Sequence, residues 1–256
     1  MNYTDISFGG GGFHIFFHLG AVRAFHDFRI KTGYTPERVL GCSAGAIAGL
    51  LMFSDGLCEY LLDNIELFMP KDGEGMAELR DRLFSGMYTW LVHNDPKIYE
   101  RCTGKLFIYA TEVRKGFSFT PVSTHVFSSY TSLKDVFDAM DASSRLPIFI
   151  SSTPKKINGK EYLDGGLLDL HPVMHPEQTL VISILPDVQF WQPSWKVPSC
   201  SRITPPGTSR VTYIWHSVKM DDPRLCYELL NEGYREIIDF TRKNSTSKGQ
   251  TTYSIW

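Results

Sequence analysis

The 256-residue sequence has no surplus of positive charge. It carries 26 Lys and Arg residues against 28 Asp and Glu residues, so its formal net charge is −2. Proteins that bind duplex nucleic acid usually present a basic surface to the phosphates, so this balance argues against a nucleic-acid partner. With 43% hydrophobic and 21% charged residues, the composition is typical of a globular protein and excludes disorder as the dominant state.

Cysteine is sparse and scattered. The chain has five cysteines and no Cys-x-x-Cys pair; they are Cys42, Cys58, Cys102, Cys200 and Cys226. Disulfide frameworks and zinc knuckles need closely spaced cysteines. We therefore expect no metal site and no disulfide framework, and reduced thiols in an intracellular protein.

Long apolar runs are also missing. The longest candidate, residues 44–53, is about half of the ~20 residues that a membrane-spanning helix needs. The N-terminal residues lack the basic and apolar regions of a secretory signal peptide. We expect a cytoplasmic protein that associates with membranes only peripherally.

Strand and helix patterns alternate along the chain, which predicts an α/β sandwich with a largely parallel central sheet. Strands are predicted at 6–8, 38–40, 105–112, 116–120, 124–127, 161–163, 180–185 and 211–218. Helices are predicted at 14–31, 46–57, 59–69, 76–92, 133–143 and 223–243, and a long loop at 186–210. We expect one domain over residues 1–256, with its motifs in a core over about 5–185 and a C-terminal extension over 186–256.

Gly41-Cys42-Ser43-Ala44-Gly45 fits the pattern G-x-S-x-G between a predicted strand and a predicted helix. This pattern is typical of a nucleophile elbow, a sharp turn that holds a serine in a strained conformation at a helix N-terminus. Gly41 and Gly45 would let the neighbouring backbones approach closely. The alternative is a purely structural turn, and the strand-turn-helix context favours Ser43 as a nucleophile.

Four glycines, Gly9 to Gly12, follow the first predicted strand and precede a helix. Main-chain N–H groups in such a loop can converge on a phosphate or an oxyanion. The dinucleotide fingerprint G-x-G-x-x-G fails because Ile15 stands at its third glycine, and no P-loop occurs. An oxyanion hole is therefore the better interpretation, with a flexible surface loop as the alternative.

Asp164-Gly165-Gly166 alone would predict only a turn. A serine nucleophile needs a proton acceptor, however, and none of the eight histidines stands in a privileged place. An aspartate has an ordinary pKa near ~3.9, and burial beside Ser43 would raise it toward the working range. A Ser–Asp dyad is therefore chemically feasible.

The three motifs, in this order, resemble the patatin-like phospholipase family, most closely its animal lipid-droplet lipase branch. Further similar stretches are 7–13, 109–113, 142–147, 159–167 and 172–173, so the resemblance covers about residues 5–185. One departure is the pair His14-Ile15, because many members have a basic residue and a glycine there.

The resemblance implies a three-layer patatin-like sandwich with Ser43 as nucleophile and Asp164 as its base. It also implies an oxyanion hole formed by Gly10, Gly11 and Gly12. The implied activity is hydrolysis of acyl esters in lipids at a membrane or lipid-droplet surface, without calcium or another cofactor.

Three rival functions remain open from the sequence. An α/β-hydrolase triad would use Ser43, Asp187 and His216 in that chain order. A catalytically silent lipid-binding protein would keep the fold without the chemistry. An acyltransferase would form the same acyl-enzyme and differ only in the acceptor.

Aromatic residues in the predicted 186–210 loop suggest a route to the lipid. Phe190, Trp191 and Trp195 are side chains that favour a membrane interface when they are exposed. The hypothesis is that this loop docks on a lipid surface. The alternative is that the three residues cap the core.

Overall fold

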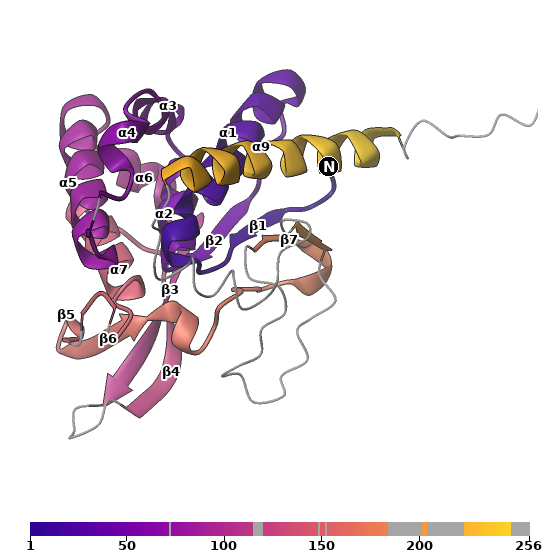
Figure 1. The fold of residues 1–256 in the computed structure, drawn as a ribbon. Coiled ribbons are helices and arrows are strands. Elements are labelled where there is room, and N and C mark those ends of the chain that lie inside the picture. Colours follow the sequence, from indigo (N-terminus) through magenta and orange to yellow (C-terminus); the bar gives the residue numbers. More distant parts are fainter. Residues whose placement is uncertain are drawn as a thin grey trace, which may run out of the picture.

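A mixed sheet of eight strands runs through the molecule (Figure 1). The computed structural model describes residues 1–71, 73–114, 120–147, 149–151, 153–183, 201–203 and 223–246. The strand order is β5-β6-β3-β2-β1-β7-β8, with β4 paired to β3. The strands are β1 (Asp5–Phe8), β2 (Arg38–Cys42), β3 (Leu106–Arg114), β4 (Thr120–Phe127), β5 (Lys155–Ile157), β6 (Lys160–Asp164), β7 (Thr179–Ile182) and β8 (Ser201–Ile203).

The pairing of β3 with β2 and with β6 positions the candidate functional residues. The strands β3, β2, β1, β7 and β8 are mutually parallel, whereas β4 and β6 run antiparallel to β3. Cys42 on β2 is opposite Tyr109, and Asp164 on β6 is opposite Ala110. The residue after Cys42 and the carboxylate of Asp164 therefore flank β3 at the same level. The predicted α/β class with a largely parallel sheet is confirmed.

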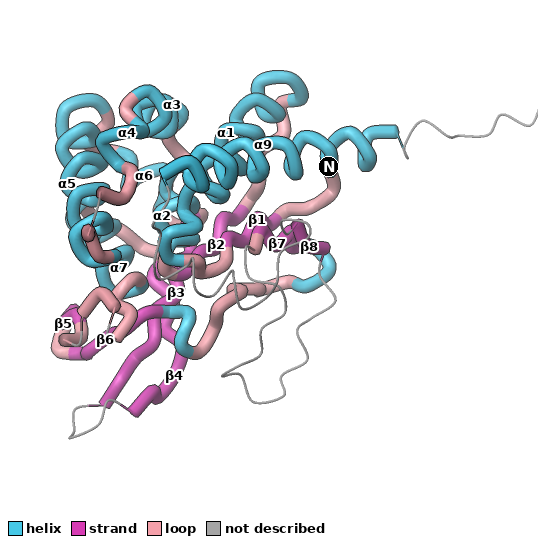
Figure 2. Tube along the Cα trace, in the orientation of Figure 1, coloured by secondary structure: helices cyan, strands magenta, loops and turns pink. Residues whose placement is uncertain are grey.

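Helices cover one face of this sheet, as Figure 2 shows. They are α1 (Ile15–Thr32), α2 (Ala44–Leu51), α3 (Asp55–Asp63), α4 (Ile65–Phe68), α5 (Met76–Asn94), α6 (Ile98–Cys102), α7 (Leu133–Ser143) and α9 (Pro223–Thr246). The fully apolar α2 packs on β1, β2 and β3, and α7 packs on β3 and β6. The buried face of α2 thus anchors the residues that precede it.

The opposite face of the sheet is covered by residues 165–178, which include the 3-10 helices η2 (Gly165–Leu167) and η3 (Pro176–Gln178). The buried Ser7 hydroxyl donates to Pro172 O at 2.5 Å, and Met174 packs on the cluster of Leu40, Cys42 and Tyr109. Helices, sheet and covering segment make three layers. The segment that follows Asp164 is therefore held against the back of β1 and β2.

The C-terminal helix α9 packs along α1 at backbone contact (Figure 1). A Cβ added to Gly20 would lie 1.9 Å from Leu230 O, and one added to Gly233 would lie 2.0 Å from Phe17 O. Each helix therefore needs a glycine where the other helix's backbone crosses it. Because Ile237 and other apolar side chains of α9 are buried, this helix is part of the main core.

Most predicted elements are present, and the differences occur at short segments. The helix predicted at 46–57 is wrong in its second half, because α2 ends at Leu51 and Ser54 caps a new helix by accepting from Leu57 N at 3.3 Å. The helix α6 and the strand β5 had no counterpart in the prediction. The 186–210 loop prediction is wrong at β8. The strand predicted at 211–218, and residues 116–119 of the strand predicted at 116–120, lie outside the described residues.

No single helix in the described part of the chain is long and apolar enough to cross a membrane. The bent pair α2 and α3 reaches the required length and composition only when taken together, with an angle of 117° between the two helices. The side chains of the four described cysteines, Cys42, Cys58, Cys102 and Cys226, are buried.

Candidate active site

Ser43 occupies the sharp turn between β2 and α2. Its backbone angles are φ 53° and ψ −126°, a region that non-glycine residues rarely adopt. A Cβ added to Gly41 would lie 2.2 Å from Gly45 O, and one added to Gly45 would lie 2.1 Å from Phe8 O. The two glycines therefore permit a turn that no side chain would fit, and the turn sets Ser43 at the N-terminus of α2.

A second serine holds this turn in place. The backbone N–H of Ser43 donates to Ser143 Oγ at 2.8 Å, and the Ser143 hydroxyl donates to Tyr109 O at 2.6 Å. Ser143 is fully buried at the end of α7. The sequence resemblance included Ser143 in a matching stretch but gave it no role. Its contacts join α7, β3 and the elbow through one hydroxyl.

Asp164 ends β6 with its carboxylate buried. Oδ1 accepts from Gly166 N at 2.8 Å, whereas Oδ2 is buried and has no hydrogen bond of good geometry among the described residues. Burial raises the pKa of Asp164 to about 6, and the Ser43 hydroxyl and the Gly166 N–H, which favour the ionised form, limit that rise. The structure therefore brings Ser43 and Asp164 together, with one carboxylate oxygen left to accept a proton.

The glycine loop passes beside Ser43, but its amides differ in their partners. A Cβ added to Gly10 would lie 3.5 Å from Ser43 Cβ. The Gly10 N–H donates to Leu170 O at 3.0 Å, so this amide is already engaged. In the described part of the chain, no backbone acceptor engages the N–H groups of Gly11 and Gly12. Gly12 has φ 55°, which glycine adopts without strain.

Gly165 and Gly166 shape the turn after Asp164. A Cβ added to Gly165 would lie 2.1 Å from Tyr109 O, so only glycine lets β6 turn this close to β3. Gly166 supplies the N–H that orients Asp164 Oδ1. The Asp-Gly-Gly motif thus fixes the orientation of the carboxylate through its first oxygen.

Two buried histidines, His14 and His18, lie close to the glycine loop in the chain. His18 on α1 is fully buried, and burial lowers its pKa to about 4, so it is neutral. Its Nε2 bonds Gly9 O at 2.8 Å. His14 is buried at the start of α1, and Ile15 lines an apolar pocket.

Two groups of residues named in the sequence analysis lie outside the described residues. They are Asp187 and His216 of the alternative triad, and the aromatic residues Phe190, Trp191 and Trp195.

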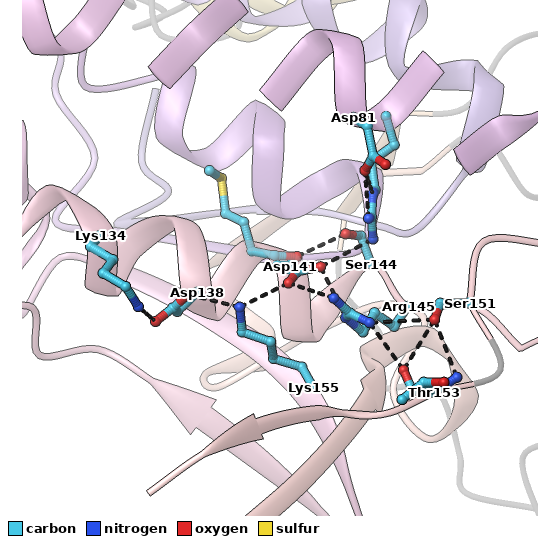
Figure 3. A network of polar contacts seen from close by, with 11 residues as sticks. Asp81, Lys134, Asp138, Asp141, Ser144, Arg145, Ser151, Thr153 and Lys155 are labelled. Atoms are coloured by element: carbon cyan, nitrogen blue, oxygen red, sulfur yellow. Dashed lines mark hydrogen bonds and ion pairs between the residues drawn. The ribbon is translucent and has the colours of Figure 1, made fainter. Parts of the chain in front are cut away.

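A charged network supports the turn after α7 (Figure 3). Asp141 accepts from Arg145 at 2.8 Å and pairs with Lys155 at 3.0 Å and Arg80 at 3.1 Å. Burial would raise the pKa of Asp141, but Arg145 and Lys155 outweigh it and lower that pKa. The carbonyl of Arg145 accepts the backbone N–H of Asp164 at 3.1 Å. The network therefore connects α5, α7 and β5 to the backbone of the candidate base.

A family model described as patatin-like phospholipase matches residues 6–176. The chain belongs to the patatin-like phospholipase family. The matched span contains the glycine loop, the elbow and the Asp-Gly-Gly turn. The family resemblance inferred from the motifs is thereby confirmed, and so is the patatin-like sandwich.

Curated relatives are distant in sequence. The human omega-hydroxyceramide transacylase is 26% identical over 263 residues, covering 95% of this chain and 48% of its own length. The human 1-acylglycerol-3-phosphate O-acyltransferase PNPLA3 is 27% identical over 191 residues, covering 70% of this chain and 37% of its own. The mouse patatin-like phospholipase domain-containing protein 2 is 22% identical, covering 94% and 50%. The chain spans about half the length of the curated relatives it matches.

The solved structure of VipD from Legionella pneumophila has the same fold. Its TM-score to this chain is 0.51 at 10% sequence identity, covering 95% of this chain and 67% of VipD. Identity this low shows the fold alone.

Proposed function

We propose that the protein is a serine acyl hydrolase that cleaves carboxylic esters of lipids with a Ser43–Asp164 dyad. Its substrates are lipids at a membrane or lipid-droplet surface, where the protein acts as a peripheral enzyme. Membership of the patatin-like phospholipase family supports the lipid acyl substrate. The observation that carries the proposal is the buried Asp164 carboxylate, whose pKa is raised by burial and which interacts with the Ser43 hydroxyl.

The reaction proceeds in two half-reactions. Ser43 Oγ attacks the ester carbonyl carbon while its proton passes to Asp164, and the carbonyl electron pair moves onto oxygen. The N–H groups of Gly11 and Gly12 stabilise this oxyanion, and one donor of this kind can lower the activation barrier by ~3 kcal/mol. Collapse expels the alcohol, which takes the proton from Asp164. Water then attacks the acyl carbon while Asp164 takes its proton, the acyl–Oγ bond breaks to release the fatty acid, and Ser43 Oγ recovers the proton from Asp164.

The raised pKa of Asp164 fits this role. A carboxylate with a pKa of about 6 is still ionised at neutral pH, yet accepts a proton more readily than an ordinary aspartate with a pKa near ~3.9. Burial therefore raises the pKa of the proposed base toward neutral pH, and no histidine is needed as proton acceptor.

The test is product analysis with a mixed panel of phospholipids, lysophospholipids and triacylglycerols. Wild type should release fatty acid from at least one class, and Ser43→Ala and Asp164→Asn should each abolish release while remaining folded. His216→Ala should turn over normally. Full activity in Ser43→Ala would overturn the nucleophile, and loss of activity in a folded His216→Ala would favour the triad instead.

Acyl transfer is a second candidate function. Two relatives are named for it, the omega-hydroxyceramide transacylase and the 1-acylglycerol-3-phosphate O-acyltransferase. The acyl-enzyme is common to both outcomes, and only the acceptor differs, since a lipid hydroxyl would replace water. A labelled acyl donor incubated with and without a lysophospholipid or monoacylglycerol acceptor separates the two. Labelled fatty acid indicates hydrolysis, and labelled acylated acceptor indicates transfer.

A further inference from the structure

The peptide group that joins Gly9 to Gly10 is held at both of its polar ends. The Gly9 carbonyl accepts from His18 Nε2 at 2.8 Å, and the Gly10 N–H donates to Leu170 O at 3.0 Å. A peptide group is planar, so a hydrogen bond at each end fixes its rotation about the chain. His18 supplies one of these two hydrogen bonds from the first turn of α1.

This peptide lies directly against the turn that carries the candidate nucleophile. A Cβ added to Gly45 would lie 2.6 Å from Gly9 O, and one added to Gly10 would lie 3.5 Å from Ser43 Cβ. The carbonyl that His18 holds is therefore packed between α1 and the start of α2. A rotation of this peptide would move the glycine loop relative to Ser43.

The glycines give the loop no orientation of their own. Glycine has no Cβ and adopts both signs of φ readily, so contacts from outside must orient four in a row. The Gly11 carbonyl accepts from His14 N at 3.1 Å, and this turn sets the peptide that carries the Gly12 N–H. The Gly11 N–H belongs to the peptide that directly follows the one held by His18, so its direction depends on that hydrogen bond.

The imidazole of His18 is a neutral donor with a fixed orientation. The side chain is fully buried, and burial lowers its pKa to about 4. A carbonyl oxygen only accepts, so Nε2 carries the ring proton. The buried Nδ1 has no hydrogen-bond partner among the described residues. The ring of Phe8 packs edge to face on the imidazole at a centroid distance of 5.4 Å, which holds the ring in place.

A histidine in this position lowers the stability of the fold. A buried acceptor without a hydrogen bond, such as Nδ1, destabilises the folded state, and a leucine of similar size would avoid that cost. An apolar side chain would, however, remove the hydrogen bond that His18 donates to the Gly9 carbonyl. The contact with the glycine loop is therefore what this histidine provides and core packing does not.

We propose that His18 is a positioning residue for the reaction, which holds the Gly9 carbonyl so that the Gly11 N–H points at the oxyanion. The inference rests on the proposed function, in which this N–H is one of the two oxyanion donors. Complete loss of one such donor lowers kcat by about 10²–10³-fold. A loop that turns this N–H partly away should therefore react about tenfold or more slowly, with KM close to the wild-type value because the donor acts on the transition state.

The experiment compares His18→Leu and His18→Gln in steady-state kinetics on p-nitrophenyl butyrate. Leucine and glutamine have similar size and similar helix propensity, but only glutamine carries an N–H that can donate to the Gly9 carbonyl. His18→Phe is a second variant without a donor, and it keeps a ring against Phe8. The matched control is His26→Leu, at a buried histidine of the same helix whose Nε2 pairs with Asp55 instead. Circular dichroism and thermal melting verify folding.

The two variants without a donor, His18→Leu and His18→Phe, should lower kcat at least about tenfold and keep KM within about twofold. His18→Gln should restore kcat to within about threefold of wild type, and His26→Leu should keep it within about twofold. Wild-type kcat in either folded variant without a donor would overturn the proposal. An equal loss in His18→Leu and His18→Gln would overturn it as well, because the hydrogen bond to the loop would then make no difference.

Failure of the positioning role and failure of the proposed function give different results. A wild-type protein that neither hydrolyses the ester nor is labelled at Ser43 by a fluorophosphonate has no active nucleophile, which would overturn the function. The positioning role is then tested without chemistry, through hydrogen exchange of the Gly10 amide, followed by NMR of protein that contains ¹⁵N-glycine. Exchange at least about tenfold faster in His18→Leu, with His18→Gln and His26→Leu like wild type, supports the role. An unchanged rate in His18→Leu, or the same acceleration in His18→Gln, overturns it.

Discussion

The backbone N–H of Ser43 donates to the hydroxyl of Ser143, 2.8 Å away and 100 residues later in the chain. Because Ser143 also donates to Tyr109 O at 2.6 Å, the position of the candidate nucleophile depends on where α7 meets β3. The strained φ of Ser43 is therefore held from both sides, by close-packed glycines within the turn and by this hydroxyl outside it.

Removing the Ser143 hydroxyl should lower kcat more than it changes KM. Ser143→Ala removes the acceptor of the buried Ser43 N–H and one donor to Tyr109 O, a cost of about 1–3 kcal/mol in unfolding free energy. With its turn less well fixed, Ser43 should attack about tenfold or more slowly, because reaction rates are sensitive to small misplacements. Steady-state kinetics on a soluble ester provides the measurement.

The neighbouring Ser144 offers the matched control. It is also buried, but its hydroxyl donates to Met140 O within α7 and does not touch the elbow. Ser144→Ala should cost similar stability and keep kcat within twofold. If both alanine variants lose kcat equally, the Ser143 hydroxyl does not position Ser43 for catalysis, and this prediction is wrong.

The rate of acylation should depend on pH through Asp164. The base must be ionised, so kcat/KM should rise about tenfold per pH unit below the pKa of about 6 and level off above it. Burial also raises the pKa of Asp169 to about 6, so this second carboxyl needs a control. Asp169→Asn should keep the inflection, and its disappearance in that variant would reassign the titration to Asp169.

Replacing Asp164 should stabilise the protein at neutral and alkaline pH. A folded pKa of about 6 above an unfolded value near ~3.9 means that the folded state binds the proton more tightly. Stability therefore falls as pH rises from about 4 through 6, by up to about 3 kcal/mol for this group. Asp164→Asn should melt several degrees higher than wild type at pH 8, with the difference closing near pH 4. A lower melting temperature at pH 8 would contradict the cost assigned to the buried charge.

Gly233→Ala should destabilise the protein although alanine usually favours helices. In an exposed helix the change would stabilise by about 1 kcal/mol. Here the new Cβ would lie 2.0 Å from Phe17 O, so α9 must move away from α1, and we expect a loss of about 2 kcal/mol or more. The unfolding free energies of wild type and Gly233→Ala are compared by chemical denaturation monitored with circular dichroism. A stability equal to or above wild type would mean that the two helices are not in backbone contact.

The sequence predicts those parts of the site that local chemistry dictates. G-x-S-x-G between a strand and an apolar helix indicates the turn at Ser43, because only glycines at Gly41 and Gly45 avoid backbone clashes there. The Asp-Gly-Gly turn becomes informative only in combination, since its nearness to Ser43 depends on β6 running antiparallel to β3. No local sequence pattern predicts the antiparallel pairing of β6 with β3.

Other features depend on contacts between distant segments. The engagement of the Gly10 N–H by Leu170 O cannot be seen from four consecutive glycines, and it is the reason why we propose Gly11 and Gly12 as the oxyanion donors. Ser143 is one of 22 serines in the chain, and only its place between Ser43 and Tyr109 distinguishes it.

The most direct measurement is the pH dependence of fluorophosphonate labelling, mapped by mass spectrometry, in wild type and Asp164→Asn. In wild type the label should be found on Ser43, with a rate that rises through a pKa of about 6. In Asp164→Asn the rate should fall by at least a hundredfold and lose that inflection. A label on another residue, or an equally fast, pH-dependent reaction in Asp164→Asn, would contradict the Ser43–Asp164 dyad.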